Sequence, residues 1–243
     1  IVLKDYYNTI KNQKYIGKKM KNFYILYEDE KIGEAFNYSF SFMGYLDTLQ
    51  GLQENIVDKK VKKIKISSHS RPFVKFNDLL YPPLVDSETV VTNTVEIGKN
   101  KIITGPNASG KTTLIKSVIL NLLFSQQVGY GFCSKGTVTP FEFIHSYINI
   151  PDSIDRDSLF QAEARRCKNI LNIVEENNNK KHFCIFDELY SGTNPYEAVS
   201  SGTAYLKYLN SKNNVKFLIT THYSKICNLF EDEVDNICME TFF

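Results

Sequence analysis

The chain has 243 residues, of which 42% are hydrophobic and 23% are charged, enough for one large globular domain or one domain with an appendage. The formal net charge is only +2, which excludes nucleic-acid binding through bulk charge but not through a local site. Because no run of about 18 apolar residues is present, we expect no membrane-spanning segment.

Residues 1–66 are predicted to be mostly helical and rich in charge. Apolar side chains between Leu46 and Ile56 recur at spacings of three or four residues, which predicts an apolar face on one helix. The lysines at positions 59–63 form a basic cluster, which we interpret as a solvated surface. The chain begins at Ile1 rather than at methionine, and this leaves open that it is a fragment of a longer protein.

From about Ile64 onwards the pattern changes to strands that alternate with helices. Prolines predict a loop-rich stretch over residues 71–83. Six further elements are predicted, namely strands at 101–104, 183–186 and 215–219 and helices at 112–124, 159–174 and 195–210. We therefore expect an α/β fold with a mainly parallel sheet flanked by helices.

A glycine-rich loop directly follows the strand 101–104. Its residues are Gly105, Pro106, Asn107, Ala108, Ser109, Gly110, Lys111 and Thr112. Glycines let a backbone wrap around phosphates with its N–H groups pointing inward, and the start of a helix adds its positive dipole end. Lys111 is expected to contact the β- and γ-phosphates, and Thr112 to bind Mg²⁺. The motif predicts ATP and Mg²⁺ as ligands, with nucleotide contacts that continue to Thr113.

Two acidic residues follow the apolar strand 183–186. Asp187 and Glu188 are thereby placed at the carboxyl edge of the sheet, where open α/β sheets bind ligands. Asp187 is predicted to hold Mg²⁺, through water, and Glu188 to accept a proton from the attacking water as general base. The alternative interpretation is an acidic strand end that faces solvent.

His222 follows the strand 215–219 in the same way. An imidazole at this strand end can touch the γ-phosphate and respond to its loss. A lone histidine is more often structural, but the two other motifs favour a catalytic role for this one.

Together these motifs resemble the ATPase domain of the MutS mismatch-repair family, a branch of the ABC-type ATPases. The resemblance covers about residues 68–235. It rests on Pro106-Asn107 in Walker A, Asp187-Glu188-Leu189 and then Gly192-Thr193 in Walker B and the loop after it, Thr221-His222-Tyr223 as a histidine switch, and Ser158-Leu159-Phe160-Gln161-Ala162-Glu163 as a signature stretch.

The resemblance implies an ABC-type P-loop ATPase domain over residues 67–243, preceded by the end of a helical lever and core region over residues 1–66. It implies an ATP site shared across a homodimer, or a heterodimer with a paralogue, in which Ser158 reaches the γ-phosphate bound by the partner's Lys111. Double-stranded DNA would bind through upstream regions that are largely absent here. Asn93 matches a family asparagine near the nucleotide, whereas residues 90–93 lack the aromatic that usually stacks on adenine.

The function implied is ATP hydrolysis coupled to mismatch binding and clamp movement on DNA. One alternative is a genome-maintenance or recombination ATPase that acts on branched DNA. Another is an ATP-gated clamp that barely turns over, against which Glu188 and His222 argue. A transporter ATPase is disfavoured because the chain has no Leu-Ser-Gly-Gly signature.

The stretch 190–195 resembles divergent family members, including those of large DNA viruses and some organelles. The five cysteines are scattered without a CxxC pair, which predicts free thiols in a reducing compartment and disfavours a zinc site. We therefore expect an intracellular protein of the cytoplasm or nucleus, with a virus factory or an organelle as further options.

Overall fold

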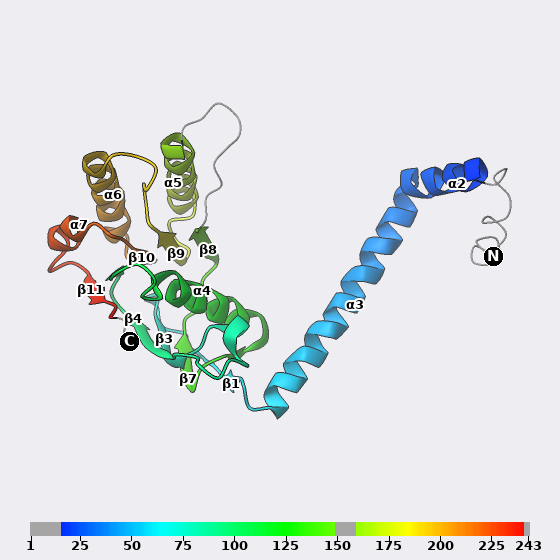
Figure 1. Cartoon of the computed structure of the whole chain (residues 1–243), viewed down its shortest axis with the longest axis horizontal. Coiled ribbons are helices and arrows are strands. Elements are labelled where there is room, and N and C mark those ends of the chain that lie inside the picture. The colour runs from blue at the N-terminus through cyan, green and yellow to red at the C-terminus, as the bar shows by residue number, and fades with distance from the viewer. Residues whose placement is uncertain (1–15, 149–158, 241–243) are drawn as a thin grey trace. The chain divides into compact units, whose positions relative to one another are not determined.

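The computed structural model describes residues 16–148 and 159–240 and divides the chain between Asp58 and Lys59 into two compact units (Figure 1). The first unit contains helices α2 (Ile16–Glu28) and α3 (Glu30–Val57). These are the helices expected in the N-terminal region, whereas residues 62–66 form short strands instead. The functional boundary between residues 66 and 67 stays a prediction.

A capping residue separates the two helices of the first unit. Asp29 is the N-cap of α3, and its side chain accepts a hydrogen bond from the Lys31 N–H at 3.0 Å. Within the described part of the chain, neither α2 nor α3 contains a buried residue. Leu46 and Leu49, on the apolar face expected from the sequence, are each 42% exposed.

The second unit is built on a five-stranded sheet with the order β11-β5-β10-β9-β8. Its strands are β5 (Lys101–Thr104), β8 (Phe143–Tyr147), β9 (His182–Asp187), β10 (Val215–Thr220) and β11 (Asp235–Cys238). Every neighbouring pair is parallel, which confirms the expected parallel sheet. The register pairs Thr220 with Asp187, so β10 and β9 end side by side.

Four helices in the described part of the chain flank this sheet, three of them predicted from the sequence and a short fourth one not. They are α4 (Lys111–Val128), α5 (Leu159–Glu176), α6 (Pro195–Asn210) and α7 (Ser224–Leu229). Side chains alternate across β9, so Cys184 and Phe186 pack with residues of α5, α6 and α7, while Phe183 and Ile185 pack with α4. Figure 1 shows α5 and α6 together on one side of β9 and β10. No described helix has both the length and the apolar character needed to cross a membrane.

A second sheet packs against α4 and was not predicted. Its order is β2-β7-β3-β4, with bounds β2 (Lys65–Ile66), β7 (Lys135–Val138), β3 (Val74–Leu79) and β4 (Asn93–Ile97). A separate antiparallel pair joins β1 (Lys62–Lys63) to β6 (Tyr130–Gly131). A 3₁₀ turn spans Pro82–Leu84.

The prediction of a loop-rich stretch over residues 71–83 is wrong at its centre, where β3 lies. Val74, Phe76 and Leu79 are buried in the core that also contains α4. Polar residues separate these apolar side chains, and Asp78 has φ +48°, where the pairing with β4 shifts register. The extra residue breaks the two-residue alternation that would have identified the strand.

Candidate functional site

The loop over residues 105–110, here called the glycine loop, joins β5 to α4. Gly105 has φ +151° and Gly110, the N-cap of α4, has φ +87°, both within the region that favours glycine. A Cβ at position 105 would lie 2.7 Å from the main-chain oxygen of Met239, so space as well as φ requires glycine there. Ala108 also has a positive φ, +60°. The loop is thus a tightly turned backbone at the N-terminus of a helix.

Lys111 is the first residue of α4 and only 6% exposed. Its Nζ donates to the main-chain oxygens of Gly105 at 3.0 Å and Pro106 at 2.9 Å. The ammonium group is therefore held over the glycine loop, at the helix end where the dipole favours an anion.

A cavity of about 250 Å³ opens at this place. It is lined by Asn107, Ala108, Gly110, Lys111, Thr112, Thr113 and Glu188. The sequence had assigned all seven to the candidate site, six to the loop and the start of its helix and one to the end of the strand 183–186. The fold brings these two segments to one cavity.

Three oxygen-bearing side chains form a cluster at the same edge of the sheet. Thr112 Oγ1 donates to the Asp187 carboxylate, 3.0 Å from Oδ2 and 3.2 Å from Oδ1. Thr220 Oγ1 donates to Asp187 Oδ1 at 2.6 Å. A hydroxyl beside a carboxylate is a ligand set that suits the hard cation Mg²⁺, so the residues present fit the expected metal.

Glu188 and His222 form a contact that the sequence did not specify. His222 Nε2 lies 2.6 Å from Glu188 Oε1, and because a carboxylate accepts, the imidazole is the donor. Both side chains are about 40% exposed, 40% for His222 and 42% for Glu188, so water reaches them. Glu188 has φ +52°, and its N–H donates to Thr220 Oγ1 at 3.2 Å.

Three candidate residues remain, and each has a different place in the chain. Ser109 is 8% exposed within the glycine loop. Asn93 begins β4 in the second sheet, opposite Leu79, and does not line the 250 Å³ cavity. Ser158 lies outside the described residues. The nucleotide contacts assigned to Asn93 and Ser158 stay predictions.

Three residues near the site make contacts that the sequence interpretation did not specify, although Glu163 belongs to the signature stretch. Thr220 joins Asp187 to the Glu188 backbone, and its place at the end of a strand next to β9 was the signal that could have found it. Met239 packs over Gly105, its N–H donating to the Thr104 oxygen at 2.8 Å. Glu163 is buried against the loop after Glu188, without a local signal for that contact.

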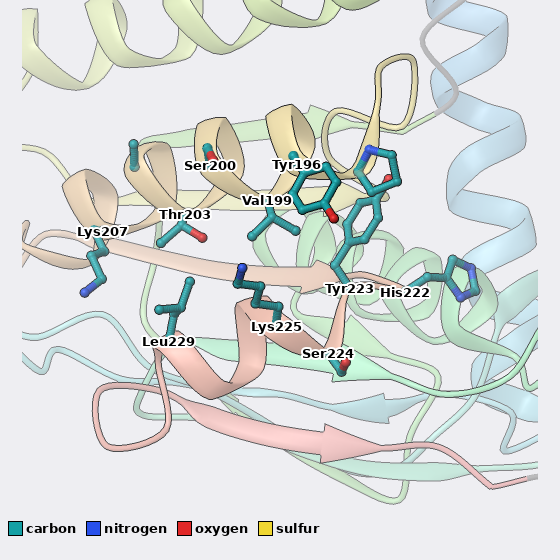
Figure 2. Close-up of a pocket in the computed structure, with 12 residues that line it drawn as sticks. Tyr196, Val199, Ser200, Thr203, Lys207, His222, Tyr223, Ser224, Lys225 and Leu229 are labelled. Carbon is teal, nitrogen blue, oxygen red and sulfur yellow. The ribbon is translucent and has the colours of Figure 1, made fainter.

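A larger cavity of about 610 Å³ lies between α6 and α7 (Figure 2). Tyr196 and Val199 of α6 line it together with Tyr223 and Leu229. Figure 2 shows His222 at one end of this row of side chains, and no residue of the glycine loop lines the cavity. Among the candidate site residues, His222, which bonds Glu188, also lines this larger cavity.

Residues 101–241 match the family described as MutS domain V. The DNA mismatch repair protein MutS of Persephonella marina is 30% identical over 207 residues, which cover 82% of this chain and 23% of that protein. The endonuclease MutS2 of Clostridioides difficile is 30% identical over 226 residues, 88% of this chain and 26% of that protein.

The matched region and the site coincide. It begins at Lys101, the first residue of β5, and contains the glycine loop, Asp187, Glu188 and His222. The chain spans about a quarter of the length of these relatives. Since the family match covers more than half of the chain, the protein belongs to the MutS family.

Proposed function

We propose that this chain contains the ABC-type P-loop ATPase domain of a MutS-like DNA mismatch-repair protein. It binds ATP with Mg²⁺ and hydrolyses it, and the turnover drives mismatch binding and clamp movement on DNA. The observation that carries this proposal is the meeting of Thr112, Asp187, Glu188 and His222 beside the glycine loop.

Phosphate binding is assigned to the glycine loop and Lys111. Positive φ values at Gly105, Ala108 and Gly110 curve the loop, and the first residues of α4, whose N–H groups have no partner within the helix, line the same cavity. Lys111 exchanges its bonds with the Gly105 and Pro106 oxygens for bonds to phosphate oxygens. The two hydrogen bonds lost to neutral carbonyl oxygens are offset by stronger bonds to negatively charged phosphate oxygens.

Thr112 and Asp187 would hold Mg²⁺, which when bound neutralises charge on the β- and γ-phosphate oxygens. The 2.6 Å bond from Thr220 fixes one oxygen of Asp187 and leaves the carboxylate in one orientation. The same hydroxyl accepts from the Glu188 N–H and so sets the position of the next residue. Thr220 therefore aligns the metal ligand and the base together.

Glu188 is assigned as the general base. The bond from His222 to Oε1 orients the carboxylate, so that Oε2 accepts the proton of the attacking water. Exposure of both side chains lets water reach this position. Because His222 holds the base directly, its movement toward the γ-phosphate would release Glu188, which links phosphate sensing to proton transfer.

The parts of the proposal that concern the dimer and DNA rest on the membership of the chain in the MutS family. In a homodimer, or a heterodimer with a paralogue, the partner's Ser158 would complete the ATP site, and DNA would contact regions outside this chain. The stretch 190–195 supports a place in a divergent viral or organelle-like branch. No feature of the described residues favours the branched-DNA alternative over mismatch repair.

The test of this proposal is the Glu188→Gln substitution, which keeps the shape of the side chain and removes its basicity. ATP turnover should fall by roughly 10²–10⁴-fold while ATP binding persists. Glu231→Gln, at an exposed position away from the site, is the matched control and should keep wild-type turnover. Unchanged turnover in Glu188→Gln would remove Glu188 from the role of base.

A second measurement addresses the shared site. Turnover per subunit is followed as the concentration of the protein rises. It should increase as dimers form if each site needs the partner's Ser158. A flat profile would contradict a site shared between subunits.

A further inference from the structure

Glu163 is a buried acid that the hydrolysis scheme does not use. It lies on α5 and is 2% exposed. Its Oε1 accepts from the Ser191 N–H at 3.1 Å and from Ser191 Oγ at 3.3 Å, and its Oε2 accepts from the Gly192 N–H at 3.2 Å. A buried carboxyl group is costly unless its oxygens are satisfied, so these donors fix where it lies.

The donors belong to residues 190–192, here called the 190–192 loop, which follows Glu188 closely in the chain. Tyr190 has φ +58°, a left-handed conformation beside which successive N–H groups converge on one point. Such a concave arrangement usually binds an anion, and here the Glu163 side chain occupies it. A strained backbone conformation is thus stabilised from α5.

Apolar contacts tie the same two segments together. The rings of Phe160 and Tyr190 have centroids 5.5 Å apart, and Tyr190 is 6% exposed. A Cβ at Gly192 would lie 2.6 Å from Leu159 Cγ, so glycine is needed for the close approach. The first two turns of α5 and the 190–192 loop are therefore in close contact at Leu159, Phe160 and Glu163.

We infer that Glu163 is a positioning residue that couples the base Glu188 to the beginning of α5. The inference rests on the proposed function, because it takes Glu188 as the base. The bonds from Ser191 and Gly192 to Glu163 fix the loop that closely follows Glu188, so the position of α5 sets the position of the base.

The primary test is Glu163→Gln in the purified protein. The amide keeps one acceptor oxygen but places an NH₂ group against an N–H donor of the loop, which displaces the loop without changing side-chain volume. The turnover number kcat should fall by roughly 10–100-fold, as expected for misplacement of a base by about 1 Å. Equilibrium ATP binding and KM should change less than about threefold, since the glycine loop is untouched.

Two further variants separate positioning from general stability. Glu176→Gln, the exposed last residue of the same helix, is the matched control and should keep wild-type kcat. Gly192→Ala leaves the carboxyl group intact but forces the loop away from Leu159, and it should reproduce the loss of kcat. It also provides the test if Glu163→Gln does not fold.

The outcomes are distinct. If Glu163→Gln and Gly192→Ala both retain wild-type kcat while Glu188→Gln is inactive, the coupling is refuted and the proposed function stands. If ATP binding and kcat fall in parallel with the melting temperature, Glu163 is only structural and the inference is overturned. A wild-type protein that does not hydrolyse ATP, or a Glu188→Gln variant with wild-type turnover, would overturn both.

Discussion

Replacement of Gly105 by alanine tests the architecture of the glycine loop most sharply. The new Cβ would lie 2.7 Å from the Met239 main-chain oxygen, 2.9 Å from Ser109 Oγ and 3.2 Å from Met239 Cβ. The hydroxyl of Ser109 can rotate away, but the Met239 oxygen is backbone, tied to β5 by the bond between the Met239 N–H and the Thr104 oxygen. The loop must therefore move.

Two effects lower the free energy of unfolding in this variant. A side chain at φ +151° carries about 1–3 kcal/mol of backbone strain. Overpacking against a fixed backbone adds about 1–3 kcal/mol. We therefore expect the free energy of unfolding to fall by about 2–6 kcal/mol, and ATP binding to weaken because the carbonyl that holds Lys111 moves with the loop.

The assay is chemical denaturation followed by circular dichroism, because the chain has no tryptophan to report by fluorescence. Gly202→Ala is the matched control, since a Cβ there meets its nearest atom, Ile226 Cδ1, at an ordinary 3.6 Å within helix α6. It should be neutral or stabilise the fold by up to about 1 kcal/mol. Equal unfolding free energies for wild type and Gly105→Ala would refute the packing of Met239 against the loop.

Two other substitutions probe the sheet edge and the core. Thr220→Val removes the hydroxyl that donates to Asp187 and should raise the Mg²⁺ concentration for half-maximal turnover severalfold, with the melting temperature little changed; an unaltered Mg²⁺ titration would contradict the assigned alignment. His145 is 6% exposed, and its Nε2 lies 3.0 Å from His182 Nδ1. Burial first, then the charges of His182 and Arg166, lower its pKa to about 4. The folded state thus binds fewer protons than the unfolded state between pH 6.5 and pH 4. The free energy of unfolding therefore falls as the pH falls through this range, by about 2 kcal/mol at pH 5. Denaturation of wild type and His145→Gln at pH 7.5 and 5 should show this loss in the wild type alone.

Local sequence signals predicted three of the five strands of the parallel sheet and three of the described helices beside it, whereas β8, β11 and α7 were not predicted. The strands β5, β9 and β10 were found within one residue at each end because each is a short apolar block buried on both faces. The start of helix α6 was found because Pro195 is a strong start signal, and the structure adds Asn194 as the N-cap, whose side chain accepts from the Glu197 N–H.

The second sheet and the fine geometry of the site escaped prediction for a physical reason. β3 pairs with β4 and β7, which lie about 20 and 60 residues away, and no local pattern encodes that pairing. The bonds from the 190–192 loop to Glu163 also join distant segments, 28 and 29 residues apart. Sequence motifs identify the candidate site residues, but only the three-dimensional structure shows which distant residues position them.

ATP binding by the glycine loop is the central claim, and equilibrium binding of ATP with Mg²⁺ to wild type and Lys111→Ala tests it most directly. The Lys111 ammonium group donates to two main-chain oxygens of the loop, and its loss should lower the affinity for ATP by about 10²-fold or more, the equivalent of two charge-assisted hydrogen bonds, in a variant that still folds. Lys116→Ala, on the same helix, is the control and should bind as wild type does. Equal affinity for wild type and Lys111→Ala, or no binding by either, would contradict the account.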